Sequence, residues 1–257
     1  MIRLDGLTVA MGERRLFNGL SATFDASRVT GIIGPNGSGK STLLRAMGAE
    51  ERPHAGSILY GHADAHRLDS RERARRRAML FQSSEVTFDF TVRELLNMGA
   101  FPFGDQGLRD VMSVARSVGL EGAIDRVVRT LSGGERQRAL LGCAVGQAEQ
   151  SNAEHPILLL DEPIAHQDPG WQLQIFELLR ACAAKGFVVV VVAHDLALAG
   201  RFCDELLLLS EGERVAHGPA GEVLTSAALE QTFGVRVATV LDDAGGQRIF
   251  IEKSGSP

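Results

Sequence analysis

The segment that most restricts the fold is a glycine-rich stretch, GPNGSGKST, which follows the apolar run Val29–Ile33 and precedes a helical pattern over residues 40–48. It fits the spacing G-x4-G-K-[ST]. Between a strand and a helix, glycines let backbone N–H groups turn towards phosphate oxygens, and the positive end of the helix faces the same anion. The alternative, a chance glycine-rich turn, is disfavoured by the flanking elements. The segment predicts an α/β fold with a phosphate site formed by Gly34, Pro35, Asn36, Gly37, Ser38, Gly39, Lys40, Ser41 and Thr42.

Two side chains of this segment have specific expected roles. The Lys40 ammonium would bridge the β- and γ-phosphates of a nucleotide, and the Ser41 hydroxyl would ligate Mg²⁺.

Three further apolar runs, at 157–160, 188–192 and 206–209, have no polar face. Continuous apolar strands are typical of the centre of a parallel sheet that is covered on both sides. Helical patterns over 171–184 and 195–202 separate these runs, which favours an α/β fold with a mostly parallel sheet. Residues 1–33 alternate instead and predict short β-strands, and residues 77–81 predict another strand after a charged helix.

Apolar spacing predicts further helices over 91–99, 107–119 and 134–148. The tail from 213 to 251 predicts a hairpin, a helix near 220–232 and closing strands.

Composition narrows the class of protein. A chain of 257 residues can bury a large core, and its net charge of −5 argues against a dedicated nucleic-acid binder. The arginine-rich run 71–77 is interrupted by Glu72 and is expected to be a solvated helix face.

Scattered Cys143, Cys182 and Cys203 exclude a disulfide scaffold and a clustered metal site. The longest apolar run, 187–193, is too short for a membrane helix, so a soluble cytosolic protein is expected.

Two carboxylates follow the apolar run 157–160. Asp161 and Glu162 would lie at the carboxyl edge of the sheet, where open α/β sheets bind ligands. We expect Asp161 to hold the Mg²⁺ shell and Glu162 to polarise the attacking water. For this motif alone the simpler alternative, two acids that open a turn before Pro163, is favoured; beside a phosphate loop it is disfavoured.

A third motif, LSGGE at residues 131–135, precedes the helical pattern 134–148. Ser132 and Glu135 have the spacing of a capping box. Gly133 and Gly134 are costly in a first helical turn, by about 1 kcal/mol each relative to alanine. They therefore indicate a close backbone approach to a second phosphate at a helix N-terminus.

Gln82 and His194 each follow a predicted strand, a position where a lone Gln or His is usually structural. Their place among the other motifs indicates function instead. The order GPNGSGKST, Gln82, LSGGE, ILLLDEP and His194 resembles that of ATP-binding cassette (ABC) ATPases over nearly the whole chain.

The resemblance implies a fold: an ATPase core with a mostly parallel sheet, an N-terminal antiparallel β-subdomain and an inserted α-helical subdomain over about 83–145. All of this would form a single nucleotide-binding domain, 1–257, with a tail over about 213–257.

The resemblance also implies ATP and Mg²⁺ as cofactors, with ATP held between two subunits, where loop 34–42 of one faces 131–135 of the other. Gln82 would reach Mg²⁺ and report on a bound permease, and His194 would contact the γ-phosphate. Asp168 matches the final Asp of the dimer-contact loop. The implied catalytic residues are Glu162, His194, Lys40 and Gln82.

The sequence departs from the family pattern in two places. Met11 stands where an aromatic residue usually stacks on adenine, which predicts weak base selectivity and use of GTP. Ile164 stands where the family usually has Thr or Ser, and Gln167 stands where it usually has Leu before the Asp of the dimer-contact loop. These changes predict an altered dimer contact, although the acidic residues of the motif are present.

Two segments are similar to the ATPases of haem, iron-siderophore and cobalamin importers: residues 88–102, and the tail with Glu222–Thr225 and Phe233–Val235. The long link 147–156 resembles the haem and cobalamin members. Residues 77–84 and 88–90 resemble the haem branch best. We therefore expect an ATPase subunit that energises haem uptake, with ferric siderophore or cobalamin as the alternative cargo. A non-transport ABC ATPase, such as an assembly factor, is a further alternative, and a regulatory module without turnover conflicts with intact Glu162 and His194.

The importer resemblance implies partners and a location. The expected assembly is a homodimer on a polytopic membrane permease at the cytoplasmic face of a bacterial inner membrane, served by a periplasmic substrate-binding protein and without nucleic acid. At least one aromatic residue is expected to line the permease-docking groove, from the set Phe88, Phe90, Phe101 and Phe103.

Overall fold

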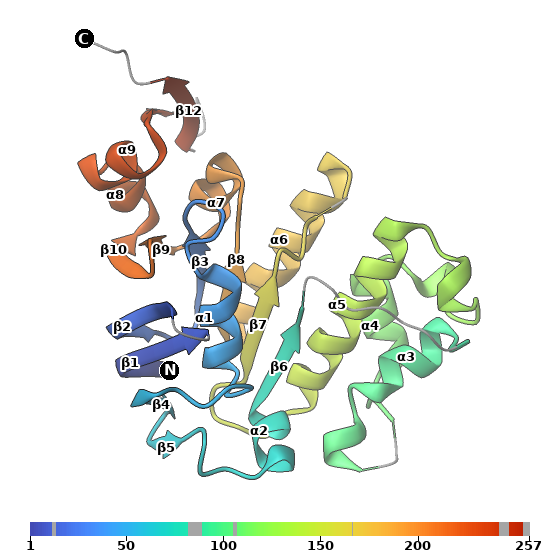
Figure 1. Cartoon of the computed structure of the whole chain (residues 1–257). Helices are drawn as coiled ribbons and strands as arrows, with labels where there is room; N and C mark the ends of the chain where they lie inside the picture. The colour runs from blue at the N-terminus through green and yellow to red at the C-terminus, as the bar shows by residue number, and fades with distance from the viewer. Residues whose placement is uncertain (12–13, 82–88, 105–106, 166, 242–246, 254–257) are drawn as a thin grey trace.

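The computed structural model describes residues 1–11, 14–81, 89–104, 107–165, 167–241 and 247–253. A six-stranded sheet lies at its centre, in the order β10-β9-β3-β8-β7-β6 (Figure 1). Five neighbouring strands are parallel, and β10 joins β9 antiparallel at one edge. The strands are β3 (Arg28–Ile33), β6 (Arg77–Leu80), β7 (Ile157–Asp161), β8 (Val188–Val192), β9 (Glu205–Ser210) and β10 (Glu213–Pro219).

Strand β8 shows why the central strands are apolar on both faces. Val189 and Val191 pack into a core with helices on one side of the sheet, whereas Val188, Val190 and Val192 pack into a second core on the other side. The first core includes α6 (Pro169–Ala184), α7 (Leu196–Phe202) and part of α5 (Gly133–Gln150), and the second includes α1 (Lys40–Met47). The predicted α/β fold with a mostly parallel, doubly covered sheet is confirmed.

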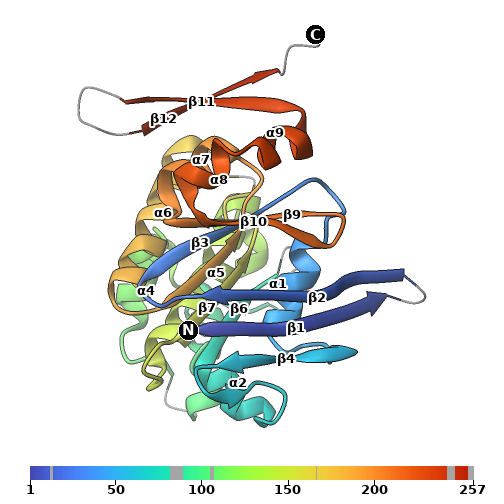
Figure 2. The same ribbon diagram turned by 90° about the vertical axis from the view of Figure 1, so that its left-hand side faces the viewer.

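The second core is closed by a four-stranded antiparallel sheet, in the order β2-β1-β4-β5 (Figure 2). Its strands are β1 (Ile2–Met11), β2 (Arg14–Phe24), β4 (Ala55–Tyr60) and β5 (Ala63–Asp64). The prediction of several short strands in residues 1–33 is wrong for the first two. Gly6 and Gly19 do not end strands, because they adopt positive φ angles beside register shifts that let the long β1–β2 pair continue.

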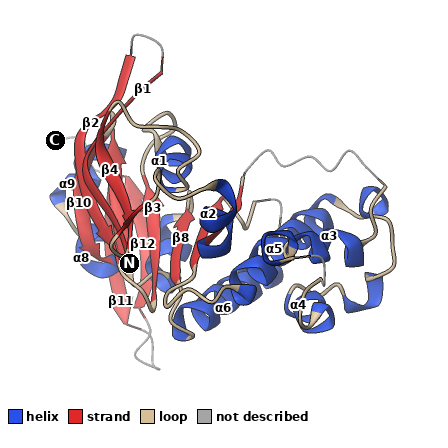
Figure 3. Ribbon diagram, turned by 90° about the horizontal axis from the view of Figure 1, so that it is seen from below, coloured by secondary structure: helices blue, strands red, loops and turns tan. Residues whose placement is uncertain are grey.

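A helical part stands beside the sheets (Figure 3). It contains α3 (Val92–Met98), α4 (Val111–Ser117) and the first half of α5, with short 3₁₀ turns at Phe101–Phe103, Glu121–Ala123 and Val128–Thr130. These elements share a third core that includes Leu96, Val118 and Val128. The boundary expected at residue 83 lies outside the described residues.

The predicted helix over 107–119 is too long. The Asp110 side chain accepts a hydrogen bond from the Ser113 backbone N–H at 2.8 Å, so it caps a helix that begins at Val111. Upstream, the Leu108 N–H donates to the Asn97 side chain at 3.0 Å and leaves the helical path.

The tail also differs from its prediction, since two helices, α8 (Ala220–Leu224) and α9 (Ala227–Phe233), replace the single helix near 220–232. The Ser226 hydroxyl explains the break: it donates to the Val223 carbonyl at 2.6 Å and accepts from the Leu229 N–H at 3.2 Å. The expected closing strands are β11 (Val235–Leu241) and β12 (Gln247–Lys253), and the charged helix is α2 (Ser70–Arg76). In the described part of the chain, every helix is too short or too polar to cross a bilayer.

Candidate nucleotide site

The loop between β3 and α1 is built on glycines. Gly37 and Gly39 have φ angles of 79° and 99°, values that side-chain-bearing residues rarely adopt. Gly34 lies so close to β9 that an added Cβ would sit 2.2 Å from the Leu209 carbonyl oxygen. The loop is therefore fixed against the sheet, and Gly39 is the N-cap of α1, a helix start without a side-chain cap. The first backbone N–H groups of a helix have no partners within the helix and can bind an anion.

Lys40 is buried beneath this loop. Its ammonium donates to the carbonyl oxygens of Gly34 at 2.8 Å and Pro35 at 2.9 Å. Burial lowers the pKa of Lys40, although nearby Glu162 and Asp161 oppose the shift. A buried cation inside a loop of N–H groups suits an anionic ligand.

Ser38 gives a direct test of whether a phosphate fits. Its hydroxyl is buried and has no hydrogen-bond partner within the described part of the chain. An unsatisfied buried hydroxyl costs about 1–3 kcal/mol. A phosphate oxygen in the loop would supply the missing partner, so the residues present fit the group.

Asp161 and Ser41 meet at the carboxyl edge of the sheet. The Ser41 hydroxyl donates to Asp161 Oδ1 at 3.1 Å. Burial raises the pKa of Asp161, and the Ser41 hydrogen bond opposes this shift. These two oxygen donors fit Mg²⁺, which keeps most of its water and phosphate ligands and needs few from the protein. Gln82, the third expected ligand, lies outside the described residues.

Glu162 and His194 face each other across the same opening, with 2.5 Å between Glu162 Oε1 and His194 Nε2. Because the carboxylate can only accept, Nε2 carries the proton in this contact. Glu162 has a φ of 50°, a left-handed conformation that is unfavourable for a residue with a side chain. Backbone strain of this kind persists only where the surrounding structure holds the residue in place, and it occurs often at functional sites.

A cavity of about 440 Å³ brings these groups together. Its lining consists of Leu16, Asn36, Gly37, Gly39, Lys40, Ser41, Thr42, Glu162 and His194. Sequence reasoning missed Leu16, which lies on β2, since only the packing of β2 against Gly212 brings it here. An added Cβ on Gly212 would lie 1.5 Å from the Leu16 carbonyl oxygen. The side chain of Met11 lies outside what the structure describes.

The LSGGE segment does not line this cavity. Ser132 and Glu135 form the predicted capping box at the start of α5, with bonds of 3.2 and 2.8 Å in the two directions. The Ser132 N–H and hydroxyl lower the pKa of Glu135. Asp168 caps α6 by accepting from the Trp171 N–H at 3.1 Å. One chain therefore holds the phosphate loop and the LSGGE segment at separate places.

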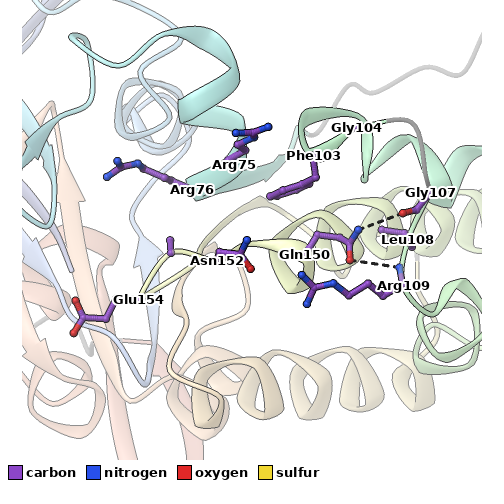
Figure 4. Close-up of a pocket in the computed structure, with 11 residues that line it drawn as sticks. Arg75, Arg76, Phe103, Gly104, Gly107, Leu108, Arg109, Gln150, Asn152 and Glu154 are labelled. Atoms are coloured by element: carbon purple, nitrogen blue, oxygen red, sulfur yellow. Dashed lines mark hydrogen bonds between the residues drawn. The ribbon is translucent and has the colours of Figure 1, made fainter.

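A second hollow of about 810 Å³ lies between α2, the 3₁₀ turn Phe101–Phe103 and the end of α5. Figure 4 shows that the guanidinium groups of its lining arginines, Arg75, Arg76 and Arg109, point in different directions. Gln150 is occupied with the Gly107 carbonyl and the Arg109 N–H. These cations do not converge on one point, so the hollow lacks the geometry of an anion site.

The comparison with known families agrees with the arrangement of the site. Residues 17–165 match the family model described as ABC transporter. The chain belongs to the ABC transporter family. Its ATP-binding members are ATPases that couple ATP hydrolysis to transport, and the predicted resemblance is confirmed.

Individual ABC relatives align along most of the chain. A hemin import ATP-binding protein, HmuV, of Bradyrhizobium diazoefficiens is 40% identical over 254 residues, covering 96% of this chain and 93% of the relative. A cobalamin import ATP-binding protein, BtuD, of Halobacterium salinarum is 39% identical over 249 residues; this is 94% of the chain, which spans only 61% of that relative. Among solved structures, the dimeric bacterial ABC transporter cassette MJ0796 is 25% identical with a TM-score of 0.75, covering 86% of this chain and 99% of that one.

Proposed function

We propose that this chain is the ATP-hydrolysing subunit of an ABC importer for haem, acting on a partner permease. The observation that carries the ATPase part is the cavity lined by Lys40, Ser41 and the Glu162–His194 pair, with Asp161 hydrogen-bonded to Ser41. We also propose that residues 1–257 form one nucleotide-binding domain.

Each group has a distinct task in the proposed reaction. Lys40 and the loop N–H groups bind and orient the phosphates, and Ser41 with Asp161 would hold Mg²⁺, which neutralises phosphate charge when bound. Glu162 accepts hydrogen bonds and so can orient the attacking water and take its proton. His194 contacts Glu162 in this structure, and in the proposed reaction it would donate to the γ-phosphate instead.

The site requires a second copy of the chain. The backbone N–H groups at the start of α5 form an anion-binding end, yet Ser132–Glu135 lie outside the cavity of their own chain. In a head-to-tail dimer the segment of one copy would complete the cavity of the other. The dimeric state of the MJ0796 cassette supports this arrangement.

Docking to the permease is proposed for the apolar patch formed by Met98 and Phe101. Phe101 is 78% exposed and Met98 is 40% exposed, so neither belongs to the core. Large apolar side chains that are exposed are candidates for an interaction site, and these two belong to neighbouring elements, α3 and the 3₁₀ turn Phe101–Phe103. Phe88, another expected docking residue, lies outside the described residues.

Haem is preferred as cargo for two reasons. Relatives named hemin import ATP-binding proteins match the chain at 36%, 40% and 37% identity in three organisms. In addition, residues 77–84 and 88–90 resemble the haem branch. The expected place of work is the cytoplasmic face of a bacterial inner membrane, with a periplasmic binding protein on the other side.

Proteoliposomes that hold the complete transporter and its binding protein test this proposal. Haem should stimulate both ATP hydrolysis and ATP-dependent uptake. Uptake of cobalamin or a ferric siderophore, with haem inert, would reject haem and leave the ATPase role standing. If the chain purifies without any membrane protein, and a soluble partner instead of a permease stimulates its ATP hydrolysis, the non-transport alternative is correct.

A further inference from the structure

The hairpin of β11 and β12 forms a sheet of its own. Within the described part of the chain, its two strands pair with each other and with neither of the larger sheets. Figures 1 and 2 show the hairpin beyond α7 and α9, at the end of the molecule opposite to β4. A lone two-stranded hairpin is only marginally stable in water, and each free edge offers unpaired backbone N–H and carbonyl groups to another strand. A further strand at one edge would therefore stabilise the hairpin.

The two faces of the hairpin differ. Val235 on β11 packs against the first core. Phe250 on β12 is 51% exposed and lies opposite Ala238, which is also exposed. Because successive residues of a strand alternate between its faces, Phe250 and Ala238 belong to the face turned away from Val235. A single exposed aromatic residue is ordinary on a protein surface, so Phe250 alone indicates no partner.

The charges around Phe250 supply a second observation. Arg248 stands two positions before Phe250 and Glu252 two positions after it, and the alternation assigns both to the same face. If β12 of a second copy ran antiparallel beside this strand, with Phe250 opposite Phe250, Arg248 of each copy would stand opposite Glu252 of the other. Opposite charges and paired aromatic residues stabilise neighbouring strands. The edge of β12 is therefore complementary to itself, as an interface between two identical copies requires.

The free edge of β11 lacks this symmetry. The positions two before and two after Ala238 hold Arg236 and Val240. An antiparallel second copy of β11 would therefore place a cation opposite an apolar residue at both positions. The comparison selects β12 as the edge that another copy would join.

We propose that β12 is a self-association edge, which joins a second copy of this chain into a continuous sheet in the order β11-β12-β12-β11. The occupant is a second copy because the charge pattern of β12, read in the antiparallel direction, matches itself. The inference goes beyond the proposed function, since it uses no residue of the nucleotide cavity or of the LSGGE segment. It predicts that two copies associate without ATP, whereas the proposed head-to-tail dimer needs nucleotide between its halves.

Charge reversal tests the pairing in the full-length chain without nucleotide, where sedimentation equilibrium should detect a reversible dimer. Arg248→Glu alone, or Glu252→Arg alone, places like charges opposite each other twice in the symmetric pair and should weaken association about tenfold. The double variant restores both pairs of opposite charges and should associate about as well as the parent chain. Arg180→Glu, at an exposed position on α6, is the matched control and should associate like the parent chain.

Cysteine cross-linking tests the register. Directly opposite residues of antiparallel strands have Cα atoms about 4.5–5.5 Å apart, a separation that a disulfide spans. Phe250→Cys should therefore give a covalent dimer with the oxidant diamide in the absence of ATP. Val215→Cys, at a 40% exposed position on β10, is the matched control and should stay mostly monomeric. The parent chain, which keeps its native cysteines, gives the background.

Several results would overturn the proposal. One is a parent chain that stays monomeric at about 1 mM without nucleotide. Another is a double reversal that associates no better than the single ones while its thermal midpoint matches that of the parent. Equal cross-linking of Phe250→Cys and Val215→Cys would mean random collision. Cross-linking of Phe250→Cys to the permease of the complete transporter, and not to a second copy, would assign the edge to a different partner.

Discussion

At the scale of single residues, the cavity and its surroundings combine several features that are energetically unfavourable in a folded protein. Lys40 and Asp161 are buried, Ser38 is unsatisfied within the described residues, and Glu162 has a left-handed backbone. Each of these features is unfavourable for the stability of the folded chain. Their concentration around one opening indicates that ligand binding, rather than stability, explains the choice of these residues.

Glu162→Gln and Lys40→Ala should separate turnover from binding. The amide cannot take a proton from water, so turnover should fall about 10²- to 10⁴-fold with ATP affinity nearly unchanged. Lys40→Ala removes a charged donor and should weaken ATP binding about 10- to 100-fold. Equilibrium binding of a fluorescent ATP analogue and steady-state hydrolysis distinguish the two effects. Parental turnover in Glu162→Gln would reject the assigned role.

His217 should make stability depend on pH. It is mostly buried against the Phe24 ring, with ring centroids 5.7 Å apart. Burial lowers the pKa of His217; Glu205 opposes this shift, Arg214 adds to it, and Asp25 opposes it to a smaller extent. A lowered pKa means that the folded chain binds the proton less tightly than the unfolded chain. The resulting stability is present above the ordinary histidine pKa, about 6.5, and is lost as pH falls below it.

The thermal midpoint, measured by calorimetry at about pH 7.5 and about pH 5.5, should therefore fall less in His217→Gln than in the parent. His155→Gln, which changes a histidine with an exposed side chain, is the control and should keep the parental difference. An identical fall in parent and His217→Gln would contradict the assignment.

At the scale of elements, one capping device recurs. Helices α2, α3 and α5 all begin with a capping box, built by Asp69 with Glu72, Thr91 with Glu94, and Ser132 with Glu135. Such a box satisfies two orphan backbone N–H groups at once. At α5 the flanking glycines leave additional backbone uncovered, so only this box combines capping with a proposed contact to phosphate.

Ser132→Ala and Thr91→Ala form a matched pair. Each removes the hydroxyl of a capping box and should lower the free energy of unfolding by about 1 kcal/mol. For a chain of this size the thermal midpoint should fall by about 2–4 °C in both variants. Only Ser132→Ala should also lower turnover of the dimer, because Thr91 lies outside the LSGGE segment. Equal activity losses would mean that Ser132 acts through stability alone.

At the scale of the whole molecule, two bodies of structure carry the two halves of the proposed dimer site. The sheets and α1 hold the phosphate loop, and the helical part holds the LSGGE segment (Figure 3). They are joined by buried Gln167 and Arg138, which are hydrogen-bonded to each other, and by the contact of Arg138 with the Trp171 ring. Motion of the helical part relative to the sheets would therefore carry the segment towards or away from a partner's cavity.

The patch of Met98 and Phe101 on the helical part should bind the permease. Phe101→Ser should leave the thermal midpoint and the ATP affinity of the isolated subunit unchanged, because the side chain is exposed. It should reduce co-purification with the permease severalfold, as for an apolar anchor of an interface. Val215→Ser is the matched control, since Val215 is 40% exposed and lies on β10. Equal loss in both variants would exclude a specific patch.

The class of fold could be predicted from the sequence alone, and so could most residues of the candidate site. The apolar runs at 157–160 and 188–192 predicted central strands, because only strands covered on both faces lack polar positions. The spacing from Gly34 to Thr42 predicted the phosphate loop, because glycines and a lysine are chemically required there. These signals are local, and a local signal can be seen in the chain alone.

Contacts between segments far apart in the chain could not be predicted from the sequence. Leu16 lines the cavity because β2 packs on the turn at Gly212. The residues around Leu16 form no sequence motif that would predict this position. Gln167 was predicted only as a departure in the dimer-contact loop, whereas the fold shows that it bonds Gly134 and Arg138 of its own chain. Such contacts depend on how α6 and α5 approach each other, and the free energy of that packing is spread over many apolar residues. No single residue in the sequence therefore encodes them.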